Sequence, residues 1–134
     1  MLIISDDDAS VLEVARGISA AVAPPSLEGY SVSARKADAF YGTDMLPAHA
    51  FFIGCGSPSP LSFRYVEELL ARVNLAGRPC GVFATTPKAL DYLRGLVAPC
   101  EAVAGKPLLA KGGAIGEASL REWAKSVLEK GGER

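Results

Sequence analysis

The chain has 134 residues, of which 49% are apolar and 22% charged, and its formal net charge is −1 at pH 7. This length and composition predict a single globular domain over residues 1–134 with a core of its own, and they exclude a disordered chain. The nearly balanced charge provides no basic field, so we expect neither a nucleic-acid nor a membrane partner.

The N-terminal residues and the cysteines indicate in which cellular compartment the protein is expected. Met1 is followed by a short apolar run and three aspartates, unlike the basic and then long apolar stretch of a signal peptide. No apolar run approaches the length of a membrane span. The three cysteines, Cys55, Cys80 and Cys100, are widely spaced and odd in number, which is typical of reduced thiols. We therefore expect a cytoplasmic protein.

The first half of the chain reads as strand, helix and strand. Leu2 to Ser5 predicts a short strand that runs directly into Asp6-Asp7-Asp8. A helix is expected next, with Ser10 and Glu13 as a capping box at its start and Pro24-Pro25 beyond its end. Its apolar face has helical spacing and comprises Val11, Val14, Ala15, Ile18 and Val22. Residues 30–34 predict a second strand, and residues 37–47 are either a loop or a short helix.

The second half alternates in the same way. Residues 49–55 form a continuous apolar run, typical of a strand buried on both faces, and Gly56 to Pro60 interrupts it. A fourth strand is expected at 80–84, with Thr86 as the N-cap of the helix that follows, and a weak fifth strand within 102–109. The three later helices are indicated by apolar residues in register: Val66, Leu69, Leu70 and Val73; Leu90, Leu93 and Val97; Leu120, Trp123, Ala124, Val127 and Leu128.

This alternation predicts an α/β domain with a doubly wound, five-stranded parallel sheet covered by helices on both faces. Ligands of such sheets bind beyond the carboxyl ends of the strands. Three loops are expected at that rim, over residues 5–10, 54–60 and 84–88, and any function is expected there.

Two of these loops carry a resemblance. Gly56-Ser57-Pro58-Ser59 after the third strand resembles the G-S-P-T/V loop of the flavodoxin family. The stretch from Leu75 to Thr85 resembles that family's L-x-G-K-x-x-x-x-F-x-T entry into the fourth strand, and Glu122-Trp123-Ala124 in the last helix is also similar. The resemblance covers most of the chain and implies the flavodoxin-like strand order 2-1-3-4-5.

Flavodoxins are electron-transfer or flavin-carrying domains, so the resemblance implies FMN as cofactor and a redox partner protein. In that family the first rim loop, S/T-x-T-G-x-T, wraps the FMN phosphate with hydroxyl and backbone N–H groups. Transferred to this sequence, the implied cofactor contacts are Ser5, Ser10, Gly56, Ser57, Ser59, Thr85 and Thr86.

The first loop departs from the family pattern. Asp7 and Asp8 stand where the family has threonine and glycine, and Pro60 stands where an aromatic residue usually stacks on the flavin. Two unit like charges about 5 Å apart repel by roughly 3 kcal/mol at an effective dielectric constant of about 20. Carboxylates that face the phosphate would therefore weaken the binding of FMN considerably. Phe63 or Tyr92 could replace the aromatic residue, although both also fit helix positions.

Two alternatives stay open. The domain could lack flavin and serve as a protein-interaction module. Residues 2–12 also resemble the opening of response-regulator receiver domains, which implies Asp6 and Asp7 as cation ligands, with Thr85 or Thr86 and Lys106-Pro107 completing the set. The phosphoacceptor position of that family falls on Gly54-Cys55-Gly56, which has no carboxylate, so only a degenerate receiver is compatible. The aspartates also have a structural explanation, since acids cap helices and favour helix N-termini.

Overall fold

The computed structural model describes residues 1–22, 32–39, 45, 48–111 and 115–132. Its centre is a parallel sheet in the order β2-β1-β3-β4-β5, with a sixth short strand, β6, paired to β4. This is the doubly wound 2-1-3-4-5 architecture expected from the sequence, so that prediction is confirmed. Within the described part of the chain, none of the helices combines the length and the apolarity that crossing a bilayer requires.

The sheet consists of short strands. They are β1 (Leu2–Ser5), β2 (Ser33–Lys36), β3 (Phe51–Cys55), β4 (Pro79–Ala84), β5 (Val103–Ala104) and β6 (Leu108–Leu109). The helices are α1 (Ala9–Val22), α3 (Arg64–Leu70), α4 (Pro87–Val97) and α5 (Glu117–Gly132), with 3-10 turns η1 (Leu61–Phe63) and η2 (Ala98–Cys100). Because all paired strands are parallel, the loops that follow β1, β3 and β4 meet at one edge of the sheet.

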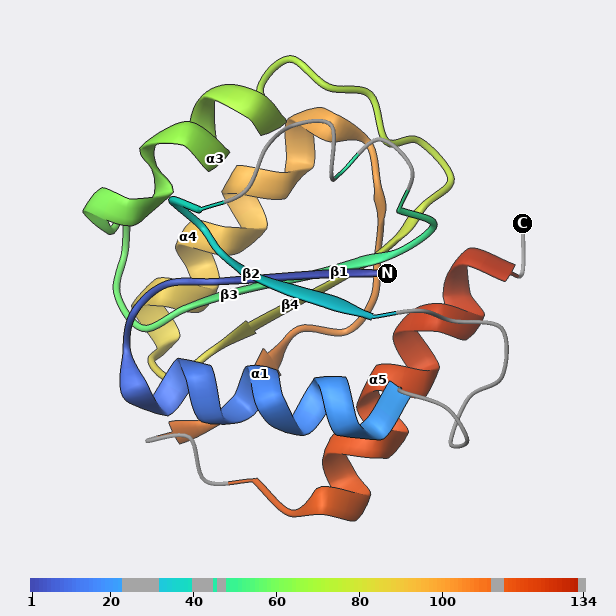
Figure 1. The fold of residues 1–134 in the computed structure, drawn as a ribbon. Coiled ribbons are helices and arrows are strands. Elements are labelled where there is room, and N and C mark those ends of the chain that lie inside the picture. Colours follow the sequence, from blue (N-terminus) through green and yellow to red (C-terminus); the bar gives the residue numbers. More distant parts are fainter. Residues whose placement is uncertain (23–31, 40–44, 46–47, 112–114, 133–134) are drawn as a thin grey trace.

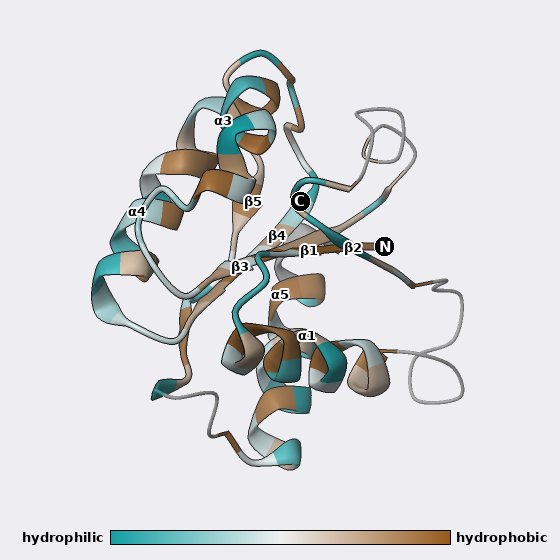
Figure 2. Cartoon of the chain, turned by 60° about the vertical axis from the view of Figure 1, so that its left-hand side comes forward, coloured by the Kyte–Doolittle hydropathy of each residue, from teal (hydrophilic) through white to brown (hydrophobic). Residues whose placement is uncertain are grey.

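Helices cover the sheet on both sides, α3 and α4 on one face and α1 and α5 on the other (Figures 1 and 2). The apolar colouring of α1 and α5 in Figure 2 lies mainly toward the strands. All five residues of β3 are buried, as the continuous apolar run predicted, because helices lie on both of its faces. All four residues of the edge strand β2 are exposed.

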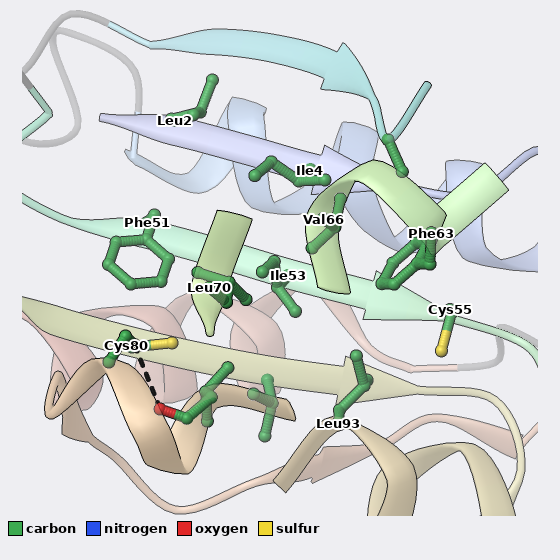
Figure 3. Close-up of a cluster of buried hydrophobic side chains, with 14 of the residues drawn as sticks. Leu2, Ile4, Phe51, Ile53, Cys55, Phe63, Val66, Leu70, Cys80 and Leu93 are labelled. Atoms are coloured by element: carbon green, nitrogen blue, oxygen red, sulfur yellow. Dashed lines mark hydrogen bonds between the residues drawn. The ribbon is translucent and has the colours of Figure 1, made fainter. Parts of the chain in front are cut away.

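Side chains alternate between two cores. On the α3–α4 face, Phe63, Val66 and Leu70 lie against Ile4, Phe51 and Ile53 of the strands, and Leu93 of α4 closes the cluster (Figure 3). Cys55, Cys80 and Cys100 are buried in this same core as free thiols. They behave as small apolar residues here.

On the α1–α5 face, three aromatic rings meet. Trp123 of α5 lies 5.5 Å from the ring of Phe52 and 6.5 Å from that of Phe83, between centroids. The indole N–H of Trp123 donates to the carbonyl oxygen of Lys106, so the polar atom of this core residue is satisfied. Gly54 and Gly81 make room for these rings: a Cβ on Gly54 would lie 2.1 Å from the Phe83 ring and one on Gly81 2.5 Å from Phe52.

Three element predictions need correction. The second strand was expected at 30–34, but β2 is Ser33–Lys36, and residues 30 and 31 lie outside the described residues. The single weak fifth strand is two strands of two residues each, β5 and β6, which pair with opposite ends of β4. The capping box of Ser10 and Glu13 is wrong, because α1 begins at Ala9 and is capped by Asp8. Most of the undecided segment 37–47 and part of the loop at 111–116 also lie outside the described residues.

Candidate functional site

The first rim loop is held to the second by the carboxylate of Asp6. This side chain follows β1 and is only 5% exposed. Its Oδ2 accepts the backbone N–H of Gly56 at 2.9 Å, and its Oδ1 accepts the N–H of Asp8 at 3.2 Å. Asp6 is thus a buried carboxylate that bridges two loops separated by 50 residues of sequence. Hydrogen bonds to a charged acceptor are stronger than neutral ones, so this is a strong connection between the loops.

Asp8 caps helix α1. Its Oδ1 accepts the N–H of Ser10 at 2.9 Å and that of Val11 at 3.3 Å, while its carbonyl oxygen accepts the N–H of Leu12. The side chain therefore satisfies the two N–H groups that an N-cap normally reaches, and its negative charge lies at the positive end of the helix. These are also the N–H groups that a bound anion would use at a helix N-terminus.

Gly56 connects all three rim loops. Its N–H is bound by Asp6, and its carbonyl oxygen accepts the hydroxyl of Thr86 at 3.1 Å. The Thr86 hydroxyl oxygen in turn accepts the N–H of Ala89 at 3.3 Å, which confirms Thr86 as the N-cap of α4. A Cβ on Gly56 would lie 2.9 Å from Oδ2 of Asp8 and 3.2 Å from the hydroxyl of Thr85. The peptide at Gly56 therefore sits in a narrow space that favours glycine.

The buried carboxylate has an unusual proton affinity. Burial raises the pKa of Asp6, and the neighbouring charges of Asp8 and Asp7 act in the same direction, while its two backbone N–H donors oppose the shift. Burial, together with the charge of Asp6, also raises the pKa of Cys55 to about 12, against an opposing backbone N–H from Ser57. Cys55 is therefore a protonated thiol at neutral pH and not a nucleophile.

Asp7 points away from this network. Its Oδ1 lies 3.4 Å from Nζ of Lys36, at the end of β2, and both side chains are more than half exposed. The receiver-like hypothesis requires Asp6 and Asp7 to hold a cation together, whereas Asp6 is engaged by backbone N–H groups and Asp7 by a lysine. No group of three His, Cys, Asp or Glu side chains suited to a metal ion occurs among the residues described.

The second loop is held by a glutamate of α3. Oε1 of Glu67 accepts the hydroxyl of Ser59 at 2.9 Å and that of Tyr92 at 2.6 Å, and these two hydrogen bonds lower the pKa of Glu67. Ser59 adopts a positive φ of 45°, a strained conformation that its hydrogen bond to Glu67 supports. Next to it, a cavity of about 300 Å³ is lined by Ser59, Pro60, Leu61, Arg64, Glu67 and Glu68.

Not all of the site residues expected from the resemblance come together. Gly56, Thr85 and Thr86 lie at the Asp6–Asp8 network, and the backbone N–H of Ser10 belongs to it. Ser57 is exposed on the same loop, and the Ser59 hydroxyl is bonded to Glu67. Ser5 is buried and lines a different cavity, between α1 and β2.

The residues present do not fit an FMN phosphate. The N–H groups of Gly56, Ser10 and Val11 are already bonded to carboxylates of this chain. A phosphate placed there would have to displace Asp8 and lie close to the buried Asp6, with a repulsion of roughly 3 kcal/mol for each pair of unit charges at about 5 Å. The replacement aromatics do not help, since Phe63 is fully buried and Tyr92 is bonded to Glu67.

The sequence missed two of the residues that shape this site. Glu67 lay within a predicted helix and was not singled out, and nothing in the sequence indicated that the loop would fold back to place Ser59 against it. The role of Asp6 as a bridge to Gly56 had no local signal, because its partner lies on another loop.

Comparison with known proteins supports the fold and nothing finer. No family model matches the sequence, and no curated protein matches it. The structure resembles a flavodoxin of Streptococcus pneumoniae TIGR4, with a TM-score of 0.79, 17% identity and coverage of 96% of this chain and 97% of that one. It also resembles a short-chain flavodoxin associated with a PDU bacterial microcompartment, with a TM-score of 0.81, 11% identity and coverage of 97% and 96%. The third similar structure is the oxidised flavodoxin 2 of Bacillus cereus, with a TM-score of 0.77, 13% identity and coverage of 96% and 97%. The chain therefore has a divergent flavodoxin-like fold.

Proposed function

We propose that this flavodoxin-like domain does not use FMN and acts as a protein-interaction module. One observation carries the proposal: the carboxylates of Asp6 and Asp8 accept the N–H groups of Gly56, Ser10 and Val11. In flavodoxins the phosphate of FMN takes such N–H groups. Here the chain supplies its own negative charge, so the rim is closed and stable without a cofactor.

The surface beside this rim is suited to contact with another protein. Leu61 is 80% exposed and Tyr65 is 40% exposed, both directly after the second rim loop. Contiguous exposed apolar surface marks interaction sites, and these two residues are the exposed large apolar side chains of the described part of the chain. We propose this surface, next to the closed rim, as the place where a partner binds.

The competing function is FMN-dependent electron transfer, which the fold alone favours. A fluorescence titration of FMN with the purified protein distinguishes the two, because binding to a flavodoxin-like site changes the flavin emission. We expect the wild-type protein to leave the emission unchanged. Saturable binding of FMN by the wild-type protein would contradict the proposal.

A double variant tests the physical cause. Replacing Asp7 by Thr and Asp8 by Gly restores the family pattern in the first loop. It should strengthen FMN binding by at least about tenfold, since about 1.4 kcal/mol corresponds to a factor of ten and the repulsion between Asp8 and the phosphate, roughly 3 kcal/mol at about 5 Å, is larger than that. Lys88→Gln, on the exposed first turn of α4, is a matched control that changes a rim charge without touching the network. Unchanged affinity in the double variant would show that the charges of Asp7 and Asp8 do not limit flavin binding.

A further inference from the structure

A second site candidate lies between helix α1 and the edge strand β2, next to the first rim loop. Helix α1 and the edge strand β2 line an open cavity of about 430 Å³. This volume is within the range of small-molecule sites, about 300–1,000 Å³. The cavity lies on the α1–α5 face of the sheet, which α1 covers next to β1 and β2 (Figure 1). It shares only Ser5 with the rim loops and no residue with the proposed partner surface at Leu61 and Tyr65.

The cavity is elongated along the helix. The residues of α1 that line it are spaced by three or four positions and extend from Leu12 to Ala20. At 1.5 Å per residue these positions span about 12 Å, or two helical turns. Its walls are mainly aliphatic, from Leu12, Ala15, Ala20 and Ala34, and Ser5 and Ser19 add two hydroxyl groups. A wall of this composition and length suits an aliphatic chain.

The charged residues that line the cavity are cations. They are Arg16, Arg35 and Lys36, and none of the described lining residues is acidic. Arg35 donates one N–H to the carbonyl oxygen of Ala34 at 3.1 Å, which leaves further donors of its guanidinium for a ligand. Lys36 is paired with Asp7, but this pair is exposed and such pairs are weak. Arginine binds a carboxylate with two parallel hydrogen bonds, so an anionic head group is favoured at this opening.

We infer that the cavity between α1 and β2 binds a small amphiphilic carboxylate, with its aliphatic chain along α1 and its carboxylate at Arg16, Arg35 and Lys36. Both halves of the ligand follow from the lining: the apolar wall selects the chain, and the cations select the charge. The inference does not depend on the absence of FMN, because the rim loops contribute only Ser5 to this cavity.

A titration followed by ¹H–¹⁵N NMR tests the inference, with sodium octanoate, sodium hexanoate and octanol as probes. Octanoate should shift the amide signals of α1 and β2 around the cavity and leave α3 and α4 unchanged. Hexanoate should bind more weakly, by about fourfold for each methylene group removed. Octanol should bind at least about tenfold more weakly than octanoate, because it lacks the charge-assisted hydrogen bonds.

Variants locate the two halves of the site. The double replacement Arg16→Gln and Arg35→Gln should weaken octanoate roughly tenfold and leave octanol unaffected. Ala34→Leu should fill the slot and weaken both probes. Arg94→Gln, which removes an exposed cation in the last turn of α4, should change neither. An unchanged ¹H–¹⁵N spectrum in the absence of ligand confirms that each variant is folded.

Three results would overturn the inference: no spectral change with octanoate, shifts centred on another surface such as Leu61 and Tyr65, or equal affinity for octanoate and octanol. A negative result with octanoate does not bear on the FMN titration, so the ligand inference and the proposed function are tested separately.

Discussion

The loops after β1 and β4 solve the same structural problem with different chemistry. Each turns the chain from a parallel strand into a helix at the same edge of the sheet, and each provides the N-cap of that helix. After β4 the cap is the neutral hydroxyl of Thr86, and after β1 it is the carboxylate of Asp8, supported by the buried Asp6. The backbone outcome is equivalent, but the electrostatic outcome is opposite. At the rim of this sheet the N-terminus of α1 is thus already occupied by a negative charge, whereas that of α4 is not.

Gly56 makes this comparison measurable, because the two loops hold opposite ends of one residue. Asp6 binds its N–H and Thr86 binds its carbonyl oxygen. Perturbing each contact separately shows how much the charged side contributes relative to the neutral one.

The largest effect is expected for Asp6→Ala. This replacement removes the acceptor of the Gly56 and Asp8 N–H groups. Each hydrogen bond to a charged group contributes about 1.5–3 kcal/mol to stability. Relief from burying the charge offsets part of this, so the free energy of unfolding should fall by about 2–3 kcal/mol in chemical denaturation. The exposed Asp7→Ala is the matched control and should change stability by less than about 0.5 kcal/mol. Equal effects of the two replacements would refute the bridging role of Asp6.

Gly56→Ala should lower the free energy of unfolding by a smaller amount, about 1–2 kcal/mol, because the added methyl group crowds its neighbours. The new Cβ would press on the Asp8 carboxylate, which is exposed and can rotate away at the expense of its cap. Combining it with Asp8→Ala should remove most of the penalty, because the crowded group is then absent. Additive losses in this double-mutant cycle would mean that Gly56 and Asp8 do not interact.

On the neutral side, Thr86→Ala should lower the free energy of unfolding by about 1 kcal/mol, the typical loss for a helix cap. Thr86→Ser keeps the hydroxyl and should recover most of it. If the serine variant is as unstable as the alanine variant, the hydroxyl contacts with Gly56 and Ala89 are not what stabilises this loop.

The pH dependence gives the smallest effect and a definite sign. Because the pKa of Asp6 is raised above its ordinary value of 3.8, the folded protein holds this proton more tightly than the unfolded chain does. Acidification through the raised pKa toward 3.8 should therefore increase the stability of the wild type relative to Asp6→Asn. The lowered pKa of Glu67 has the opposite effect, but it is present in both proteins and cancels in the difference. If the wild type instead loses stability relative to Asp6→Asn on acidification, the burial of Asp6 is contradicted.

Much of the fold was predictable because it depends on local periodicity. The helix faces ending in Leu128, the buried run at β3 and the Thr86 cap were all expected from residues close in sequence. The errors have physical reasons. Ser10 and Glu13 matched a capping box, yet Asp8 is at least as good a cap and lies two residues earlier, so the helix begins there. The last strand was divided because Gly105 and Pro107 interrupt the region between β5 and β6.

The candidate site was predictable in position but not in its contacts. Parallel topology places the loops after β1, β3 and β4 at one edge, so the rim was expected. Sequence reasoning could not distinguish aspartates that face a ligand from aspartates that bind their own backbone, since this depends on a partner 50 residues away. Ser59 and Glu67 show the same limit, because a serine expected to face a cofactor donates to α3 instead.

The most direct test of the central claim is an NMR pH titration that follows the carboxyl ¹³C signal of Asp6 together with the amide signals of Gly56 and Asp8. If the carboxylate accepts these N–H groups, both amides should titrate together with Asp6 at a pKa above 3.8. Amide signals that stay constant while the carboxyl signal titrates would show that the loop does not supply its own anion, and the reason for excluding the FMN phosphate would be lost.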